Sequence, residues 1–450
     1  MTSLFIFRLD LRLKDNIGLI QCFKKSDKII PCFIFDPNQI DKKKNLYFSN
    51  NCVQFMIESL KELYIQSKKT LLFFHGDTID VLKYLIKNLD INNIYLNKDY
   101  TPYSINRDKQ IENLCLNKCS FYSFDDLLLN NIEEPLKNDN KPYSVYSSYL
   151  NNVIGNKIKT PNNLSVKKKL FKIEQELKFQ ISLEDLSNFY IFNENINVNG
   201  GRKKAKLILN NIIIQKDYDK LRSLCDYKST HLSAYIKFGC VSIREVYYCF
   251  INNLKKDSGL VKQLYWREFY YYLLYHFPKT YTEKIGLKST YKNFPWETDK
   301  TKFDTWCKGE TGFPIVDASM KNLNETGYMP NRSRLIVANF LTKLLRIDWK
   351  MGEKYFAQKL VDYSVSNNLG NWQWVASIGS DYQNRIYNPM SQSKKSDPDC
   401  IYIKKWLPIL KDLPNKNIHD CTIDLEDYPK PIIDYRKEYN KSKALFKEYL

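Results

Sequence analysis

The sequence Ile-Ile-Pro-Cys-Phe-Ile-Phe-Asp at residues 29–36 is an apolar run of strand length that ends in a carboxylate. Similar runs and two helix-period segments alternate around it: runs at residues 4–7, 70–74 and 93–96, and helical segments around 49–66 and 78–89. Short apolar runs separated by helices are typical of parallel strands joined by crossover helices. We therefore predict an α/β fold with a doubly wound parallel sheet for the first part of the chain. No Gly-x-Gly-x-x-Gly motif follows the first run, so a phosphate bound at that turn is not predicted.

The alternation weakens after residue 126. Asn-rich stretches and the run Lys167-Lys168-Lys169 indicate an exposed connection. After Gly200-Gly201 the pattern is helical to the end of the chain, and Asn331 to Leu345 is the clearest helix because its apolar residues form one broad face. The predicted organisation has three parts: an α/β domain at 1–126, an interdomain connection at 127–199 and an all-helical domain at 200–450.

Composition limits the class of protein. The chain has 450 residues, of which 43% are hydrophobic and 14% aromatic, so it can bury the cores of two domains. It lacks a run of about 18 apolar residues, and its first residues lack the basic segment and cleavage site of a signal peptide. The 11 Cys residues include one close pair, Cys115 and Cys119, with no second pair spaced for zinc. We expect an intracellular protein with reduced thiols, no membrane span and no metal site.

The charge of the chain is strongly positive. The 69 Lys and Arg residues outnumber the 50 Asp and Glu residues, which gives a formal net charge of +19. Such an excess indicates a polyanionic partner, most commonly nucleic acid. A lysine-rich surface that only keeps the protein in solution explains the charge equally well, so charge alone leaves both readings open.

Four stretches of the C-terminal half combine Trp, Arg, Asn and Asp at unusual density: residues 263–269, 309–318, 330–334 and 362–374. Each has an ordinary structural explanation when it is taken alone. A Trp on a helical stripe is usually a core residue, and an Arg pair suits an exposed helix start. Their occurrence together indicates a shared site.

These stretches resemble motifs of the DNA photolyase/cryptochrome family, and the resemblance spans nearly the whole chain. The N-terminal segment Phe7 to Asn16 is similar to the family's FRRDLRLxDN. The remaining matches follow in family order: Ser229–Ser233 resembles TSRLS, Trp266–Phe269 matches WREF, Thr311–Ala318 matches TGxPIVDA, Asn331–Arg334 matches NRxR, Asn368–Ser377 matches NxGxWQWxAS and Arg385–Pro389 resembles RIFNP. The arrangement is most similar to that of class I cyclobutane pyrimidine dimer photolyases.

The resemblance implies a fold and an activity. The fold would be a Rossmann-like antenna domain followed by an all-α domain that binds FAD and DNA. The activity would be that of a deoxyribodipyrimidine photo-lyase, a carbon–carbon lyase of damaged double-stranded DNA. In that reaction light-excited FADH⁻ passes an electron to a cyclobutane pyrimidine dimer flipped out of the duplex. We expect a monomer with a cationic rim around a hole wide enough for two fused pyrimidines.

Other functions stay open at this stage. A cryptochrome-type blue-light sensor is one alternative, although such sensors commonly carry long C-terminal extensions and the helical pattern here runs nearly to Leu450. A (6-4) photoproduct photolyase is another, but its enzymes place His residues in the lesion pocket and residues 330–334 contain none. A DNA-binding module without a chromophore is the third, and it would be colourless.

The resemblance also implies which residues contact FAD. They are Tyr218, Ser229, Thr230, His231, Leu232, Ser233, Arg267, Arg334, Asp362, Ser364 and Asn368. Hydroxyls and backbone N–H groups at residues 229–233 suit a pyrophosphate. Arg334 and Asp362 would form a buried ion pair beside the flavin ring, where a fixed cation stabilises the anionic reduced form. Asn368 falls where the family places a side-chain amide at flavin N5. His231 stands in place of an Arg and Ser364 in place of an Asp, so one charge and one flavin hydrogen bond are in question.

A second implied set contacts DNA: Arg222, Gln263, Trp266, Asn331, Arg332, Leu335, Trp374 and Gln392. Trp266 and Trp374 would be stacking walls for the dimer. Gln263 and Asn331 offer hydrogen bonds to base edges, and Arg332 suits a phosphate. Leu335 replaces a Met of similar volume.

A third implied set is an electron-transfer chain from the flavin to the surface through Trp372, Trp349 and Trp296. Indole is easily oxidised, so three rings in sequence could reduce a resting flavin, although all three could also be core residues. The family further implies a second, antenna chromophore of deazaflavin or folate type. Alignment on Arg107-Asp108 puts Ser104 where folate-using relatives carry an acidic residue. Folate is therefore disfavoured, and a deazaflavin or an empty pocket stays open.

Overall fold

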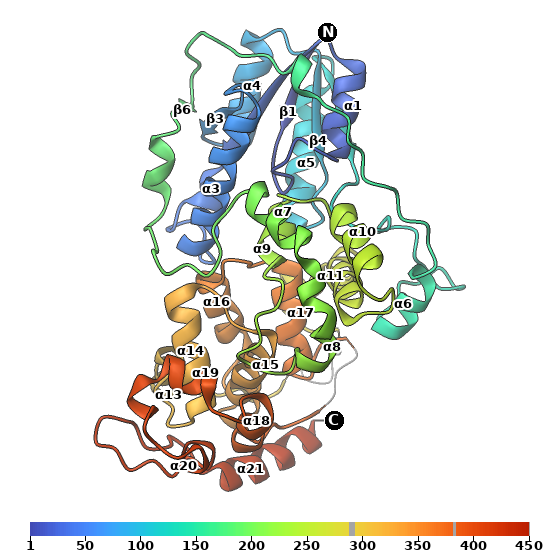
Figure 1. The fold of residues 1–450 in the computed structure, drawn as a ribbon. Coiled ribbons are helices and arrows are strands. Elements are labelled where there is room, and N and C mark those ends of the chain that lie inside the picture. The colour runs from blue at the N-terminus through green and yellow to red at the C-terminus, as the bar shows by residue number, and fades with distance from the viewer. Residues whose placement is uncertain (288–292, 381–383, 450) are drawn as a thin grey trace.

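The N-terminal part of the chain is built on a six-stranded sheet with the order β5-β4-β1-β2-β3-β6. The structure, a computed structural model, describes residues 1–287, 293–380 and 384–449. The strands are β1 (Thr2–Ile6), β2 (Lys28–Phe35), β3 (Leu72–His75), β4 (Asn93–Asn97), β5 (Ser120–Phe124) and β6 (Gln180–Ile181). β1 to β5 are parallel, and only β6 runs antiparallel, beside β3. The predicted doubly wound α/β fold is confirmed (Figure 1).

Helices cover both faces of this sheet, as the alternation of side chains along each strand shows. Phe5 and Phe33 belong to one core cluster with residues of α1 (Ile17–Lys25) and α3 (Asn50–Gln66). Leu4 and Ile30 belong to a separate cluster with residues of α4 (Thr78–Asn88) and α5 (Pro102–Cys115). Strands buried on both faces read as continuous apolar runs, which is why the pattern identified them.

Some elements of this part escaped the sequence pattern. β5 is only half-buried, and its sequence Ser-Phe-Tyr-Ser-Phe is short and mixed. The helix α5 has few apolar positions, since only Ser104, Ile111, Leu114 and Cys115 are buried. The helix α1 was also missed, although Asn16 caps it by accepting a hydrogen bond from the Leu19 amide, 3.0 Å away. Weak amphipathicity and short length explain these omissions.

The strand order places a topological switch point between β1 and β4. The chain winds from β1 through β2 to β3 in one direction, then returns to the other side of β1 with β4 and β5. Helices that leave neighbouring strands in opposite directions open a crevice at the carboxyl ends of those strands. A ligand site is therefore expected just beyond Ile6 and Asn97.

Residues 127–199 are more ordered than the exposed connection expected from sequence. They contain α6 (Tyr146–Val153) and β6, which extends the sheet at β3. Leu127, Leu128 and Leu186 are buried in the same core cluster as α1 and α3. In Figure 1 this segment runs along both the α/β part and the helical part.

From residue 200 onward the described chain is helical, as predicted. The helices that surround the sites discussed below are α8 (Tyr218–Leu221), α9 (Ser233–Lys237), α11 (Gly259–His276), α12 (Lys279–Thr282), α13 (Lys300–Lys308), α15 (Asn331–Asn339), α16 (Trp349–Lys359), α17 (Val365–Val375), α18 (Pro389–Ser396) and α21 (Tyr435–Glu448). The helices α7 (Arg202–Asn210), α10 (Ile243–Asn253), α14 (Pro314–Thr326), α19 (Ile401–Trp406) and α20 (Asn415–His419) complete the bundle in Figure 1. The helix expected over 331–345 changes at Phe340 into a π-helical segment, Phe340–Leu344. None of the described helices is long and apolar enough to span a membrane.

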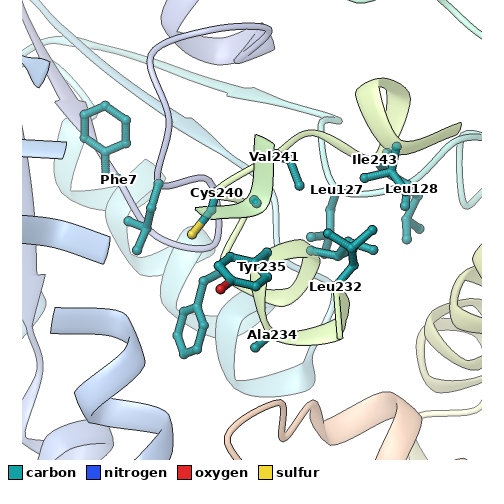
Figure 2. Packing of buried hydrophobic residues seen from close by; sticks show 14 of the residues in the cluster. Phe7, Leu127, Leu128, Leu232, Ala234, Tyr235, Cys240, Val241 and Ile243 are labelled. Carbon is teal, nitrogen blue, oxygen red and sulfur yellow. The ribbon is translucent and has the colours of Figure 1, made fainter. Parts of the chain in front are cut away.

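The α/β part and the helical part share one core. Figure 2 shows Phe7 and Leu127 of the first part near Tyr235, Cys240 and Val241 of the second. Buried ion pairs cross the same boundary, since Arg244 binds both Asp15 and Asp126, and Asp126 also binds Arg12 within the first part. Unpaired buried charges are costly, so each of these groups depends on its partners for its position.

Candidate functional site

A small cavity lies between α15 and α17 in the helical part. Its volume is about 80 Å³, and we call it the helix cavity. Fourteen residues line it: Asn331, Arg334, Leu335, Ala338, Phe356, Leu360, Asp362, Tyr363, Ser364, Asn367, Asn368, Asn371, Trp372 and Val375. Seven of them are residues singled out from the sequence, namely Asn331, Arg334, Leu335, Asp362, Ser364, Asn368 and Trp372.

An ion pair forms one wall of the helix cavity. Arg334 Nη2 donates to Asp362 Oδ2 at 2.9 Å and to Oδ1 at 3.1 Å, while Arg334 Nε donates to the Met329 carbonyl. Burial would raise the pKa of Asp362, but Arg334 and a hydrogen bond from Ser233 hold that pKa below its usual value. Asp362 therefore stays ionised, and its charge fixes the guanidinium at the cavity wall.

The loop at residues 229–233 adjoins this pair. Ser233 Oγ donates to Asp362 Oδ2 at 2.7 Å, and Thr230 Oγ1 accepts from the Leu232 amide at 3.3 Å. His231 has a left-handed backbone, with φ of 52°, and its Nδ1 lies 3.0 Å from the amide of Asn197. Burial lowers the pKa of His231, so its ring is neutral near pH 7.

Asn368 lies on α17 with its amide already engaged. Its Nδ2 donates to the backbone carbonyl of Glu353 at 3.0 Å and to Glu353 Oε1 at 3.1 Å. Ser364 stands at the N-cap position of α17, where its Oγ makes no cap hydrogen bond but accepts from Asn367 Nδ2 at 3.1 Å and lies 3.3 Å from the hydroxyl of Tyr271. A hydroxyl therefore occupies the place of the expected carboxylate.

Two other expected FAD contacts do not line the helix cavity. Arg267 Nη1 donates to the Leu127 carbonyl at 3.0 Å, whereas its Nη2 is buried without a hydrogen-bond partner among the described residues. Tyr218 is half-buried at the start of α8, and burial raises its pKa. Its ring lies 6.0 Å from the guanidinium of Arg222, which is exposed.

The expected DNA contacts are spread more widely. Asn331 and Gln263 are exposed, and Arg332 donates to Ser223 Oγ at 3.1 Å. Trp266 is half-buried, and Tyr146 stacks on it with ring centroids 3.5 Å apart and planes inclined by 11°. One face of this ring is therefore already covered by protein. Trp374 on α17 and Gln392 on α18 are half-buried and do not line the helix cavity.

The three Trp residues of the expected electron chain lie on neighbouring segments of the helical part. A Cβ on Gly352 would be 2.2 Å from the ring of Trp372, so the α16 backbone touches that ring one turn after Trp349. Ile347, two residues before Trp349, is bridged to Glu297, which follows Trp296. Trp372 and Trp349 are 2% and 1% exposed, whereas Trp296 is half-buried, so the last ring of the series is the most exposed.

Sequence reasoning missed several residues of this neighbourhood. Trp306 is fully buried on α13, and its ring centroid is 6.4 Å from that of Trp372. Asn367 and Asn371 line the helix cavity on the same side of α17 as Asn368. The three amides at helical spacing, residues 367, 368 and 371, were a sequence signal that could have identified Asn367 and Asn371. No such signal marks Trp306, because a single Trp in Asp-Thr-Trp-Cys is typical of a core residue.

A much larger cavity opens at the carboxyl edge of the sheet. Its volume is about 570 Å³, and we call it the sheet cavity. It is lined by segments that follow β1 and β4 at the switch point, by α3 and α5, and by residues of the helical part that include Tyr271, Tyr281, Lys284 and Tyr363. Tyr363 and Ser364 line both cavities, so one wall separates them.

The lining of the sheet cavity combines aromatic rings with cations and carboxylates. Phe35, Phe48 and Tyr103 contribute rings, while Arg8, Arg107 and Lys237 contribute positive charge. Ser104, which stands where folate-using relatives carry an acidic residue, lines this cavity and donates to Asp99 Oδ2 at 2.7 Å. Asp99 thus places a carboxylate beside Ser104 in the cavity. Apolar walls with a few convergent polar groups, in a volume of about 300–1,000 Å³, are typical of small-molecule sites.

The residues around the helix cavity fit a flavin by chemistry, although not by volume. The fixed guanidinium of Arg334 is a donor suited to an anionic cofactor. The expectation of a hole wide enough for two fused pyrimidines is not met by this cavity, because about 80 Å³ is far below the volume of a small-molecule site.

Comparisons with known proteins agree with this picture. A family model described as DNA photolyase matches residues 3–163, and one described as the FAD binding domain of DNA photolyase matches residues 260–448. The chain is 33% identical to a deoxyribodipyrimidine photo-lyase of Synechococcus sp., over 99% of this chain and 96% of that relative. It is 28% identical to a cryptochrome DASH of Synechocystis sp., over 97% of this chain and 96% of that relative.

A solved structure extends the similarity to three dimensions. The archaeal photolyase from Sulfolobus tokodaii is 35% identical and superposes with a TM-score of 0.90, with all of both chains covered. That protein is described with two FAD molecules and with a novel light-harvesting cofactor. The expected FAD-binding helical part is therefore confirmed at the level of the family.

Proposed function

This chain belongs to the DNA photolyase family, and from that premise we propose that it repairs cyclobutane pyrimidine dimers in double-stranded DNA under blue light. One observation supports the proposal above the others. The helix cavity is lined both by the ion pair of Arg334 and Asp362 and by Asn331 and Leu335, which are expected to face the lesion. A reduced flavin and a flipped dimer need such adjoining surfaces.

The residues of the chain have distinct tasks in this proposal. Reduced FAD, when bound, supplies upon excitation the electron that splits the cyclobutane ring and takes it back afterwards. Arg334, held by Asp362, places a permanent positive charge next to the anionic ring. Ser233 orients Asp362, and Arg267 offers its unpartnered Nη2 to the cofactor.

DNA binding rests on charge and on aromatic faces. The net charge of +19 favours a polyanion, and Arg332 and Arg222 near the start of α15 and the end of α8 suit phosphates. Trp266 would stack with the face that Tyr146 leaves uncovered. In this proposal residues 200–450 form the FAD- and DNA-binding domain, 1–126 the antenna domain and 127–199 their connection.

Trp372, Trp349 and Trp296 are proposed as the path that reloads the cofactor with electrons. The series starts at the helix cavity and ends at a half-buried ring. An external thiol is the proposed final donor, since each electron that leaves Trp296 must be replaced. Repair itself does not use this path, because the electron returns to its source.

The sheet cavity is proposed to take a second, planar chromophore. Its aromatic walls suit a ring system, and its Arg and Lys residues suit phosphate or carboxylate groups. The relative from Sulfolobus tokodaii, described with two FAD molecules, favours a flavin or deazaflavin over a folate. The excitation energy of a chromophore in the sheet cavity would then be transferred to the flavin at the helix cavity, across the wall that contains Tyr363 and Ser364.

The decisive experiment joins spectroscopy with repair. The purified protein is expected to show a flavin absorption band and, after chemical reduction, to restore a thymine-dimer oligonucleotide under blue light but not in the dark. A flavin-containing protein that repairs neither double- nor single-stranded dimers would favour the sensor function, to which the cryptochrome DASH relative points. Repair of (6-4) products is not favoured, since His75, His231, His276 and His419 do not line the helix cavity.

A further inference from the structure

The connection at residues 127–199 contacts three consecutive residues of α11. Tyr146 of the connection stacks on Trp266, and Arg267 Nη1 donates to one of its backbone carbonyls at 3.0 Å. Glu268 accepts hydrogen bonds from it as well. Consecutive side chains of a helix point in directions about 100° apart, so the connection surrounds α11 on more than one side.

Glu268 fixes the position of the connection against α11. Its carboxylate accepts from the backbone amides of Leu129 and Asn130 at 2.6 and 3.0 Å. It also accepts from Asn130 Nδ2 at 2.7 Å and from the Tyr149 hydroxyl at 2.8 Å. Glu268 is 2% exposed, and a buried carboxylate needs such donors because its desolvation is otherwise costly. Loss of this register would therefore be unfavourable.

Tyr146 is attached to α11 at two points. Its ring centroid lies 3.5 Å from that of Trp266, and the two planes differ by 11°. Its hydroxyl donates to the carbonyl of Lys262, one helical turn before Trp266, at 3.0 Å. Burial raises the pKa of this hydroxyl, so it stays protonated and donates. The tyrosine therefore has a fixed orientation relative to the indole that it covers.

Trp266 is linked to the helix cavity through one neighbour. Its ring centroid is 5.8 Å from that of Tyr270, and the Tyr270 hydroxyl donates to Asn371 Oδ1 at 3.3 Å. Asn371 lines the helix cavity. The indole also meets Phe269 edge to face, with centroids 6.0 Å apart, and it is half-buried. The ring is thus held from behind and along its edge, while part of it stays accessible.

We infer that Tyr146 is a positioning residue for the lesion, through which the connection sets how strongly the protein prefers damaged over undamaged DNA. The inference rests on the proposed function, because it assumes a flipped dimer stacked on Trp266. An indole that is already fixed loses little conformational freedom when the dimer binds, so the complex is more stable. An undamaged duplex presents no flipped dimer to this ring and is held by phosphate contacts.

The test measures the affinity of full-length, FAD-containing protein for two duplexes of one sequence, with and without a thymine dimer. Tyr146→Ala removes the stacked ring, so the affinity for the dimer should fall about tenfold, whereas the affinity for the undamaged duplex should not change. Tyr146→Phe keeps the ring and loses only the hydrogen bond to Lys262, so it should stay within about threefold of wild type. At saturating DNA, repair per absorbed photon should be equal in all three proteins.

Two further variants separate this role from a general loss of packing. Tyr84→Ala removes a ring that meets Phe179 on α4, in a core cluster of the α/β part, and should leave both affinities unchanged. Tyr146→Leu fills the space without an aromatic face, so it carries the prediction of Tyr146→Ala where that variant does not fold.

A spectroscopic signal reports the position of the indole directly. In protein labelled with fluorotryptophan, the ¹⁹F resonance of Trp266, identified with Trp266→Phe, should move in Tyr146→Ala and stay near its wild-type position in Tyr146→Phe. An unchanged preference for damaged DNA in Tyr146→Ala would overturn the inference, and so would an equal loss of affinity for both duplexes. A wild-type protein that binds both duplexes alike would instead refute the proposed function, on which the inference rests.

Discussion

The sheet cavity is the larger of the two cavities but has the weaker sequence signal, and the helix cavity is the smaller but has the stronger one. The sheet cavity holds about 570 Å³, yet its lining is drawn from many short segments, and the quoted motifs contribute little to it beyond the first. The helix cavity holds about 80 Å³, yet two of the recognisable motifs, Asn331–Arg334 and Asn368–Ser377, supply much of its wall. Volume alone would place the main site at the sheet. Fixed charges and amides at helical spacing favour a main site between α15 and α17, because the proposed electron donation requires a controlled electrostatic environment more than it requires room.

The largest expected effect would come from breaking the charge pair of the helix cavity. Arg334→Met leaves the Asp362 carboxylate, whose side chain is 5% exposed, without its cation. Removal of one partner of a buried pair costs about 3 kcal/mol or more of folding stability. Loss of the cation beside the anionic cofactor should in addition weaken FAD binding by roughly a hundredfold. Equilibrium titration of the apoprotein with FAD measures the change.

The neighbouring Arg332→Met is the matched control for this variant. Arg332 lies on the same helix but contacts only Ser223 among the interactions found for it, so FAD binding should be unchanged. DNA binding should weaken instead, and the slope of the logarithm of DNA affinity against the logarithm of salt concentration should decrease by about one unit. Equal FAD affinity in both variants would show that the helix cavity is not the main cofactor site.

A second variant asks whether the sheet cavity binds a ligand of its own. Met56 lines this cavity on α3, so Met56→Trp should fill part of it and weaken binding of riboflavin, used as a probe, by about 2 kcal/mol, roughly thirtyfold. Fluorescence quenching of the probe reports this binding. Ile65→Trp, on the same helix and at a site that is 68% exposed, is the control. If both variants bind the probe alike, the larger cavity is not a riboflavin site.

A third variant tests the electron path out of the helix cavity. Trp372→Phe should slow the photoreduction of oxidised FAD by about an order of magnitude and spare repair after chemical reduction. Trp306→Phe removes an equally buried indole in contact with Trp372 and should leave photoreduction intact. Transient absorption measures both rates. If Trp306→Phe is the slower of the two, electrons leave through α13 instead.

The smallest expected effect concerns pH. Burial lowers the pKa of His231 while Asp362 works against this and Lys228 adds to it, so the ring is neutral near pH 7. A diphosphate at this loop would favour the protonated ring, so FAD binding takes up a proton. The affinity for FAD therefore rises as the pH falls through the pKa that His231 has in the FAD complex. It decreases again as the pH rises above that pKa. FAD titration from about pH 8 to about pH 6 should show this rise.

His231→Arg supplies the control, because a guanidinium keeps its charge throughout this range. Its FAD affinity should exceed that of wild type by about threefold at the upper pH, as expected for a partly exposed ion pair, and should not vary with pH. A pH profile as steep as that of wild type would remove His231 from the phosphate contacts.

The sequence predicted elements best where burial is complete. The runs at 4–7, 29–36, 70–74 and 93–96 became β1 to β4, since strands buried on both faces are made mostly of apolar residues. β5 and α5 were missed because β5 is only half-buried and few residues of α5 are buried. The connection at 127–199 was taken as exposed from its Lys and Asn content, yet β6 pairs with β3 there. A two-residue strand is too short for any periodic signal.

The candidate site was predicted unevenly for a related reason. Contiguous motifs identified Arg334, Asp362 and Asn368, whose contacts lie within one region of the helical part. Tyr146 and Tyr149 were not found, since they are two of 33 Tyr residues and stand in an ordinary stretch. Their importance comes from the contact between α6 and α11.

By itself the sequence determined the chemistry available to this protein: the family, the order of an α/β part before a helical part, and the cation, amide and indole groups of its main site. Periodicity and motifs carry that information because they depend on residues close together in the chain. Only the tertiary structure decided which of those groups meet, how wide the two cavities are, and that Tyr146 of the connection stacks on Trp266. Such contacts join residues far apart in sequence, and their geometry depends on packing that no local pattern encodes.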